Sequence, residues 1–454
     1  MFVDSTRFLV GNMKKLLRRN AADNLHKIIN KTHTSDLASV FQLLSQSDQK
    51  AFFDLFDSVE KKAMLFSELE PEIVLSLTEA EPAEKVAEIL EWMPGDDVAD
   101  LLGKISNERA TALLDLMTKK GSEEVEELLG YDPKTAGGIM VVDFIALNQE
   151  TTAKEAVEAL QKEYIDIEMP FYLYVVDDYG YLRGVVSLRQ LVVVPPATQL
   201  KSIMDANVVS VQTHTDQEEV AQIVAHYNVL AVPVIDEHNK LVGIVTVDDV
   251  IDIIHEEATE DILKMAGLGG SVEYIENQTI FKSIRKRLPW LLASWIGGVI
   301  ACYVVAHFEQ SLNKLVYLAA FMPIIMGMGG NVGTQTSASI MRGLATGRID
   351  INQIWSIILR EFSIGFCLGF VYGAMLSLFA QFKYGFEMWE LGMVVGFAMI
   401  CSMTLAATLA SSIPLVFHRF RIDPAVATGP FVTTFTDILS MFFYFKIATL
   451  LLHL

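Results

Sequence analysis

Five long apolar runs in the second half of the sequence constrain the fold more than any other feature. Each run carries little or no charge and is long enough to supply the about 20 residues that a membrane-spanning helix needs. The runs cover residues 288–308, 315–341, 362–382, 391–417 and 424–452. Because every backbone polar group in lipid must be paired within the protein, these runs predict a bundle of five transmembrane helices.

The basic residues around these runs predict their orientation. Loops on one side carry Arg285, Lys286, Arg287, Arg342, Arg348, Arg419 and Arg421, whereas loops on the other side carry only Lys314 and Lys383. Loops rich in Lys and Arg stay in the cytosol. We therefore expect a multi-pass protein of the cell (inner) membrane, with cytosolic N-terminal domains and the C-terminus outside.

Charge divides the sequence into two parts. Residues 1–280 contain 23 basic and 49 acidic residues, a net charge of −26, whereas residues 281–454 carry +5 of the overall −21. So acidic a soluble part argues against a nucleic-acid partner, which needs basic patches, and suits a partner of positive charge. The alternative is that acidity only keeps the domain soluble.

The three cysteines, Cys302, Cys367 and Cys401, all lie in apolar segments and have no CxxC spacing. This pattern predicts small packing residues, with neither a disulfide framework nor a zinc site.

Residues 21–133 show short amphipathic helices interrupted by Asp, Pro and Gly. Asp36, Glu72 and Asp97 stand at three expected helix starts, and each precedes apolar residues at helical spacing. Stacked helix pairs that form a superhelix are the predicted architecture. Residues 1–20 are assigned to an N-terminal tail, either ordered or frayed.

Residues 140–260 contain an internal repeat with an offset of 59 residues. Tyr-Val-Val-Asp at 174–177, followed by Gly-Val-Val-Ser at 184–187, recurs as Val-Ile-Asp at 234–236 followed by Gly-Ile-Val-Thr at 243–246. A strand ending at Asp, a turn and a second apolar strand predict a hairpin. With its flanking helical sequence, the repeat resembles a pair of α/β CBS modules, assigned to residues 134–198 and 199–262.

CBS pairs are regulatory modules that sometimes hold adenine nucleotides, so the resemblance makes ATP a candidate cofactor. The second copy carries Thr246 and Asp249 in the Thr-x-x-Asp arrangement that can meet a ribose. The matching position of the first copy is Gln190, so at most one site is expected. A structural strand-to-helix turn is the alternative interpretation.

An acidic stretch follows the second hairpin. On a helix, Asp249, Asp252, Glu256 and Glu260 step by three, four and four residues and share one face. Like charges at that spacing repel, so bound cations would stabilise the helix; a solvated acidic face is the alternative. Beyond it, residues 279–288 are expected to form a basic amphipathic helix at the membrane surface.

Two features inside the membrane half point to an ion path. Residues 323–335 are rich in Gly, Asn, Thr and Gln, which predicts irregular backbone that breaks the second span. Asp437 lies on a polar stripe of the last span with Thr433, Ser440 and Tyr444. A charge there costs roughly 3 kcal/mol on insertion scales and indicates an ion pathway. A buried, hydrogen-bonded carboxyl group is the alternative.

Two further groups of residues in the third span have simpler explanations. Gly365, Gly369 and Gly373 repeat every four residues, which predicts close contact with another helix. Arg360 and Glu361 stand near the cytosolic end, where snorkelling and surface pairing account for them.

Taken in order, these segments resemble the MgtE family of magnesium transporters over nearly the whole chain. The resemblance rests on Asp437 and on the signature Pro-x-x-x-Gly-x-Gly-Gly-Asn-x-Gly-x-Gln at 323–335. It implies a multidomain fold: an all-α superhelical N-terminal domain, a cytosolic α/β tandem CBS pair, a connecting (plug) helix region at 263–288 and an α-helical membrane bundle of five spans at 289–454. Gly429 departs from the Asn that some members carry before the proline of the fifth helix.

The resemblance also implies a homodimer in the lipid membrane and a channel-like flow of Mg²⁺ down its electrochemical gradient. Mg²⁺ prefers oxygen ligands and is commonly held by one or two carboxylates and retained waters. A symmetric pair of Asp437 residues would suit a largely hydrated ion, with backbone carbonyls around Asn331 and Thr433 accepting hydrogen bonds from its water shell. No Walker A motif is present for coupling to ATP hydrolysis.

Family behaviour implies that cytosolic Mg²⁺ bridges the acidic faces of the N-terminal and CBS domains and holds the pore shut. The candidate regulatory residues are Asp97, Asp100, Asp248, Asp249, Asp252, Glu256, Glu257 and Glu260.

Two other readings stay open at this point. The same architecture suits another divalent cation such as Co²⁺, Mn²⁺ or Ca²⁺, because oxygen-only sites differ mainly in size and flexibility. A membrane cation sensor that transports nothing would leave Asp437 without a role. An enzyme is not expected, because the soluble part shows no nucleophile and base in a pocket-like context.

Overall fold

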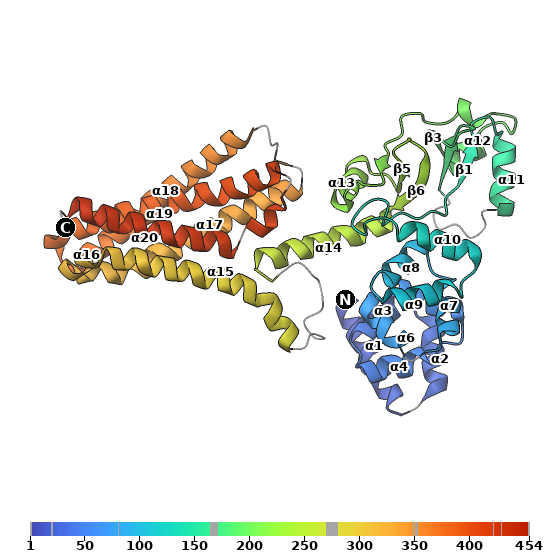
Figure 1. Cartoon of the computed structure of the whole chain (residues 1–454), viewed down its shortest axis with the longest axis horizontal. Coiled ribbons are helices and arrows are strands. Elements are labelled where there is room, and N and C mark those ends of the chain that lie inside the picture. Colours follow the sequence, from blue (N-terminus) through green and yellow to red (C-terminus); the bar gives the residue numbers. More distant parts are fainter. Residues whose placement is uncertain are drawn as a thin grey trace. The chain divides into compact units, whose positions relative to one another are not determined.

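The computed structural model describes residues 2–19, 21–79, 81–163, 171–268, 280–346, 348–349, 353–420, 422–427 and 429–452. The chain divides into two compact units, Met1–Ile253 and Ile254–Leu454, drawn in Figure 1.

The first unit begins with a helical domain. Its helices are α1 (Phe2–Leu17), α2 (Ala22–Lys31), α3 (Thr34–Gln42), α4 (Gln46–Phe53), α5 (Val59–Ser67), α6 (Pro71–Thr78), α7 (Ala83–Leu90), α8 (Gly95–Leu102), α9 (Asn107–Leu114) and α10 (Lys119–Leu128). Helix α3 contacts α5, α5 contacts α7 and α7 contacts α9, while α4, α6, α8 and α10 contact one another in the same alternating order. This stacking of helix pairs is the predicted superhelix.

The predicted helix starts are confirmed. Asp36, Glu72 and Asp97 stand in the first turns of α3, α6 and α8, where a carboxylate interacts favourably with the helix dipole. Residues 1–20 are assigned to an N-terminal tail by the sequence pattern, but most of them form α1. This helix contacts α2, α3 and α4, and its Met13 is completely buried. Helix α1 is therefore part of the helical domain.

The repeat forms two three-stranded sheets. The first copy contains β1 (Ala146–Asn148), α11 (Ala153–Glu163), β2 (Tyr172–Val176), β3 (Leu182–Ser187), α12 (Leu188–Val193) and the 3₁₀ turn η1 (Leu200–Ser202). The second contains β4 (Val211–Gln212), α13 (Gln217–Tyr227), β5 (Ala231–Ile235), β6 (Leu241–Thr246) and α14 (Val247–Met265). In both sheets the first strand is parallel to the second, which pairs antiparallel with the third.

The predicted hairpins are confirmed, and one aspartate organises each turn. Asp177 accepts hydrogen bonds from the backbone N–H groups of Tyr179 and Tyr181. Asp236 accepts the equivalent bonds from His238 and Lys240. A short polar side chain that satisfies the turn backbone is what favours Asp there.

The helical domain and the second CBS copy share one hydrophobic core. Leu128, Met140, Val211 and Val250 belong to the same buried cluster. The segment after α10 is hydrogen-bonded to the second CBS copy: the N–H of Ala136 donates to the carbonyl of Thr215 at 2.7 Å. The two domains therefore form one unit.

The connection between the units differs from the prediction. Helix α14 extends from the second CBS copy to Met265, while residues 269–279 of the expected connecting region lie outside the described residues. The basic segment expected as a separate surface helix forms instead the first turns of α15 (Ile280–His307), which continues into the first span. Pro289 does not end that helix.

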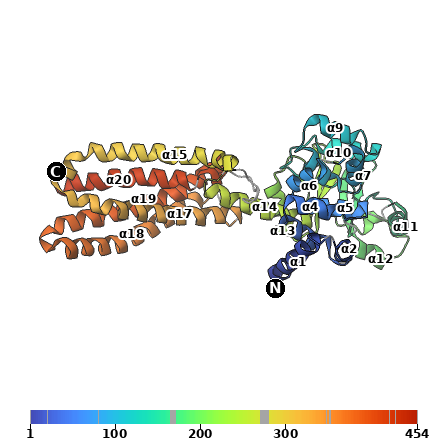
Figure 2. The same cartoon turned by 90° about the horizontal axis from the view of Figure 1, so that it is seen from below.

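The described residues of the second unit include five helices that are long and apolar enough to cross a membrane. They are α15, α17 (Met322–Ala345), α18 (Ile354–Tyr384), α19 (Trp389–Arg419) and α20 (Pro430–Leu451). Helix α16 (Glu309–Lys314) and the 3₁₀ turns η3 (Val316–Phe321), η5 (Phe386–Met388) and η6 (Pro424–Ala427) lie between them. The long helices run side by side in both views (Figures 1 and 2).

Helix α19 is the most buried of these spans and contacts α17, α18 and α20. The predicted close contact of the third span is confirmed: Gly365, Gly369 and Gly373 are all buried against α19. An added Cβ at Gly373 would lie 2.6 Å from the carbonyl oxygen of Gly396. Small residues let the two backbones approach.

Candidate ion path and cytosolic acidic junction

Helix α20 carries Asp437 and is anchored in the bundle by its neighbouring face. The Ser440 hydroxyl lies 2.7 Å from the Ser402 hydroxyl of α19, and the Tyr444 hydroxyl donates to the carbonyl of Leu318 at 2.8 Å. Both side chains are fully enclosed, whereas Asp437 is half-buried. The predicted polar stripe is thus divided: Ser440 and Tyr444 hold the helix in place, and Asp437 stays accessible.

Thr433 lies one turn before Asp437 and is also half-buried. Its hydroxyl donates to the carbonyls of Gly429 and Pro430, at 3.1 and 3.2 Å. The hydroxyl proton is thereby committed to the first turn of α20.

Residues 323–335 form regular helix, so the prediction of a broken second span is wrong. Pro323 stands in the first turn of α17, where its missing N–H costs no hydrogen bond. Gly329 and Gly333 face α20: an added Cβ at Gly329 would lie 3.2 Å from the Ser440 hydroxyl, and one at Gly333 would lie 3.4 Å from Val432. Gly329 and Gly333 thus serve close packing, whereas an added Cβ at Gly327 or Gly330 would meet nothing within 4 Å.

Asn331 is exposed on α17, between these two packed glycines. Because α17 and α20 are in contact, Asn331 and Asp437 belong to neighbouring helices. Neither is enclosed within the described chain.

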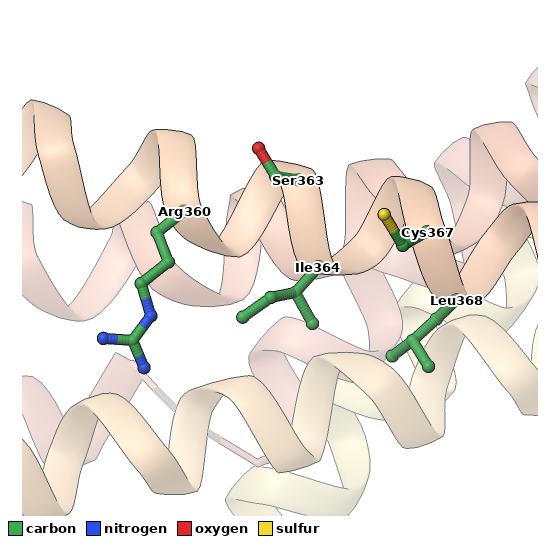
Figure 3. Close-up of a pocket in the computed structure, with 5 residues that line it drawn as sticks. All are labelled: Arg360, Ser363, Ile364, Cys367 and Leu368. Carbon is green, nitrogen blue, oxygen red and sulfur yellow. The ribbon is translucent and has the colours of Figure 1, made fainter.

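Glu361 differs from its predicted role as a surface-paired residue. Only 7% of it is exposed, and the Thr336 hydroxyl of α17 lies 3.5 Å from its carboxylate. Arg360, the neighbouring residue, lines an open pocket of about 520 Å³ along α18 with Ser363, Ile364, Cys367 and Leu368 (Figure 3). Glu361 is thus a second carboxyl group inside the bundle. Its burial is not predicted from the sequence, because the neighbouring Arg360 suggests a surface ion pair.

In the cytosolic unit, acidic residues of two domains meet. Asp97 of α8 and Asp249 of α14 are both half-buried, and the charge of Asp249 acts on Asp97. The pKa of each carboxyl group is raised to about 6. Burial is the main cause, and the charges of neighbouring carboxylates add to it. Asp100 is exposed beside Asp97, and partial desolvation raises the pKa of its carboxyl group. We call Asp97, Asp100 and Asp249 the acidic junction.

The remaining candidates are arranged around or beyond this junction. Asp248 and Asp252 add their charges to Asp249 and are exposed. Glu256, Glu257 and Glu260 follow on the same helix α14 but belong to the second compact unit. The charges that act on one another in this region are those of the candidates up to Asp252, and the last three continue along the same helix.

Thr246 and Asp249 form the start of α14. The Thr246 hydroxyl donates to the Asp249 carboxylate, and the equivalent residues of the first copy, Ser187 and Gln190, form a capping box at the start of α12. The repeat thus uses the same pair of positions in both copies to cap a helix. This geometry agrees with the structural alternative for Thr-x-x-Asp.

Among the residues that the structure describes, no group of three or more His, Cys, Asp or Glu side chains stands close enough to hold a metal ion. A cation at Asp437 or at the acidic junction therefore needs water or ligands from a second chain. For Mg²⁺, which keeps several of its waters, few protein ligands are sufficient.

Sequence reasoning missed a further charged group where α14 meets the membrane helices. Lys264 pairs with Glu260 and with Asp423, 159 residues later. Spacing along the chain carries no signal for such a contact.

Comparisons with known proteins agree with this architecture. The family model MgtE, described as a divalent cation transporter, matches residues 322–447. The MgtE intracellular N domain matches 32–134, and the CBS domain matches 136–195 and 200–256.

Among solved structures, the cytosolic domain of the Mg²⁺ channel MgtE in complex with ATP is 36% identical, with a TM-score of 0.51, and covers 54% of this chain and 99% of its own. The soluble part of a magnesium transporter is 30% identical, with a TM-score of 0.50, over 56% of this chain and 99% of its own.

Two curated relatives extend the similarity into the membrane unit. The magnesium transporter MgtE of Bacillus subtilis is 36% identical over 341 residues, which are 75% of this chain and 74% of the relative. The magnesium transporter MgtE of Thermus thermophilus is 35% identical over 346 residues, 75% of each chain. With its five membrane helices and its paired cytosolic modules, the chain belongs to the MgtE family of magnesium transporters.

Proposed function

We propose that the chain forms a channel-like path for Mg²⁺ at Asp437, and that Mg²⁺ bound at the acidic junction closes this path. Magnesium transport is the activity of the family. The observation that carries the gating proposal is the approach of Asp97 and Asp249, which come from two different domains.

The path at Asp437 requires a homodimer. One carboxylate per chain is a weak site, but two carboxylates related by a two-fold axis suit a hydrated Mg²⁺. Backbone carbonyls near Asn331 and Thr433 would accept hydrogen bonds from its waters. Flow is downhill, because no site for coupling to ATP hydrolysis is recognisable in the sequence.

Gating follows from electrostatics at the acidic junction. Half-buried carboxylates repel each other, and a divalent cation between them removes that repulsion. High cytosolic Mg²⁺ would hold the N-terminal and CBS domains together; at low Mg²⁺ the domains separate and α14 releases the pore. Asp248 and Asp252 would add to the attraction, and Glu256, Glu257 and Glu260 would extend it along α14.

ATP at the CBS pair is a further part of the proposal. A similar cytosolic domain was solved with ATP, and the ribose would meet Thr246 and Asp249. Since these two side chains already bond one another, ATP binding would have to replace their contact.

Liposome flux tests the transport path, and patch recording tests the gating. Magnesium entry is followed with an internal indicator, and inhibition is measured against cytosolic Mg²⁺ for the native chain and for the triple variant Asp249→Asn, Asp252→Asn, Glu256→Gln. Weaker inhibition in the variant is expected. Unchanged inhibition would remove the acidic residues from the gate, and absence of any flux in the native chain would favour the sensor function.

A second candidate is transport of another divalent cation, because the matching family model is described as a divalent cation transporter. Competition of Co²⁺, Mn²⁺ and Ca²⁺ with Mg²⁺ in the same liposomes decides between them. Mg²⁺ selectivity predicts that none of the three displaces Mg²⁺ at equal concentration.

A further inference from the structure

At the end of helix α14, the ammonium group of Lys264 pairs with a carboxylate that lies just before α20. The Lys264 Nζ atom lies 2.6 Å from Asp423 Oδ2 and also pairs with Glu260, one turn earlier on α14. The Lys264 and Glu260 side chains are only 18% and 15% exposed. Asp423 is 38% exposed. Removing one partner of a shielded ion pair leaves the other charge without compensation, which is costly.

Asp423 is itself fixed by the backbone that follows it. Its Oδ1 accepts a hydrogen bond from the N–H of Ala425 at 2.8 Å, while Oδ2 accepts from Lys264. Ala425 is fully buried in the 3₁₀ turn η6. The carboxylate therefore ties Lys264 to a fixed turn just before α20, rather than to a mobile side chain.

Close backbone contacts stand beside this ion pair. Gly429 has a φ of +59°, and an added Cβ there would lie 2.0 Å from the Met265 carbonyl oxygen. Gly267 has a φ of +71°, and an added Cβ would lie 2.9 Å from Pro430. Only glycine fits such conformations and distances. This contact gives a structural reason for Gly429 where some family members carry Asn.

Carboxylates outnumber cations at this contact. Burial and the charge of Asp423, with smaller effects of Glu257 and Glu260, raise the pKa of Asp261 to about 6 even though Lys264 opposes them. Desolvation acts against a charged Lys264, but its bonds to Asp423 and Glu260 prevail and raise its pKa. The geometry places the Lys264 ammonium group between two of these carboxylates, those of Glu260 and Asp423.

We infer that Lys264 is a positioning residue, which seats the end of α14 on the start of α20 without a metal ion. Asp437 lies seven residues after Pro430, about 10 Å further along α20 at 1.5 Å per residue. A displacement of α14 is thus passed to the helix that carries the ion site. Where this seat affects gating, the inference rests on the proposed function.

Hydrogen exchange of the full-length protein in EDTA tests the seat without any transport measurement. In the native chain, amides of 260–268 and of 422–432 should exchange slowly although metal is absent. Lys264→Gln should speed exchange there about tenfold, as expected for losing a charge-assisted contact, and leave strands β5 and β6 unchanged. Lys240→Gln, an exposed lysine on the CBS pair, is the matched control and should change nothing.

The double exchange Lys264→Asp with Asp423→Lys keeps one cation among the same carboxylates but loses the acceptor for the Ala425 N–H, so it should slow exchange of 260–268 relative to Lys264→Gln without fully restoring it at 422–427. If Lys264→Gln does not fold, Asp423→Asn removes the same pair from the other side and is measured instead. Exchange that is equally slow in native and variant protein would overturn the inference. So would native exchange that is fast in EDTA and slows only with Mg²⁺, because the seat would then require a divalent ion.

Patch recording adds the functional consequence. Lys264→Gln should raise the cytosolic Mg²⁺ concentration for half-inhibition about tenfold, because α14 no longer transmits domain closure. If the native channel itself is not inhibited by Mg²⁺, the proposed gating fails, while the exchange experiment still decides the role of Lys264. Normal inhibition together with fast exchange in Lys264→Gln would contradict its part in gating.

Discussion

At the scale of single residues, the carboxyl groups of Glu361 and Asp437 lie in unlike surroundings within the membrane helices. Glu361 is enclosed between α18 and α17 and receives a hydroxyl contact from Thr336. Asp437 is half-buried beside a face of α20 that Ser440 and Tyr444 hold in place. A carboxylate that is reachable yet rigidly mounted suits an ion ligand, because its position is set by groups that do not touch the ion.

Asp437→Asn should reduce Mg²⁺ flux into liposomes by about tenfold or more, because charged contacts are worth roughly 1.5 to 3 kcal/mol each. The matched control is Glu361→Gln, which removes the other carboxyl charge but keeps an acceptor for Thr336, and it should retain flux. Equal losses in both variants would contradict a special role for Asp437.

At the scale of helices, glycine residues determine how closely α18 and α19 approach one another. An added Cβ at Gly369 would lie 2.8 Å from the Cα and 3.0 Å from the carbonyl oxygen of Ile400. Backbone cannot move aside as a flexible side chain can, so α18 would have to shift away from α19.

Gly369→Ala should therefore lower the stability of the detergent-solubilised protein by about 1 to 3 kcal/mol, seen as a lower midpoint of thermal unfolding. Gly298→Ala in α15 is the control, because an added Cβ there meets nothing within 4 Å; it should leave the midpoint unchanged or raise it through helix propensity. A similar loss in both variants would mean that the α18–α19 contact is not the cause.

The junction of α8 and α14 gives a pH-dependent prediction. The pKa of Asp97 and of Asp249 is raised from 3.8 to about 6, so the folded state binds more protons than the unfolded state between about pH 4 and 6. Stability from these groups is therefore lost as pH rises through that window. In EDTA, the native midpoint should fall more between pH 4.5 and 7 than that of Asp97→Asn with Asp249→Asn.

Mg²⁺ should reverse this loss at pH 7 in the native chain and have less effect in the double variant. The control pair Asp54→Asn with Asp57→Asn replaces exposed carboxylates and should behave as the native chain. If the midpoint of unfolding depends on pH identically in the native and double-variant proteins, repulsion between Asp97 and Asp249 does not lower the stability of the native chain.

At the scale of the whole molecule, the chain is a multi-pass membrane protein with a cytosolic N-terminal domain. We propose that the C-terminus lies outside, as the positive residues around five spans predict. The short segment η5 between α18 and α19 then also lies outside. Phe386 within it is 72% exposed.

In a variant without the native cysteines, Phe386→Cys should react with a membrane-impermeant maleimide on intact cells. Ser47→Cys, exposed in the helical domain, should react only after permeabilisation. Labelling of Ser47→Cys on intact cells would reverse the orientation.

Features that depend on local pattern could be predicted from the amino-acid sequence. Apolar length predicts the five spans, because lipid demands uninterrupted helix; the 59-residue repeat predicts the two hairpins; and acidic residues such as Asp36 and Glu72 mark helix starts. These features follow from hydrogen bonding and helix dipoles within a few residues, so they can be read without knowledge of distant contacts.

Tertiary structure alone decided how residues far apart in the sequence meet. The composition of 323–335 predicted a broken helix, but the helix is continuous, and Gly329 and Gly333 pack against α19 and α20. Glu361 is enclosed, and Lys264 reaches Asp423, although neither fact has a signature in spacing. The approach of Asp97 to Asp249 likewise depends on how the helical domain packs on the second CBS copy. Such contacts arise from the global minimum of packing and electrostatics, which no local pattern encodes.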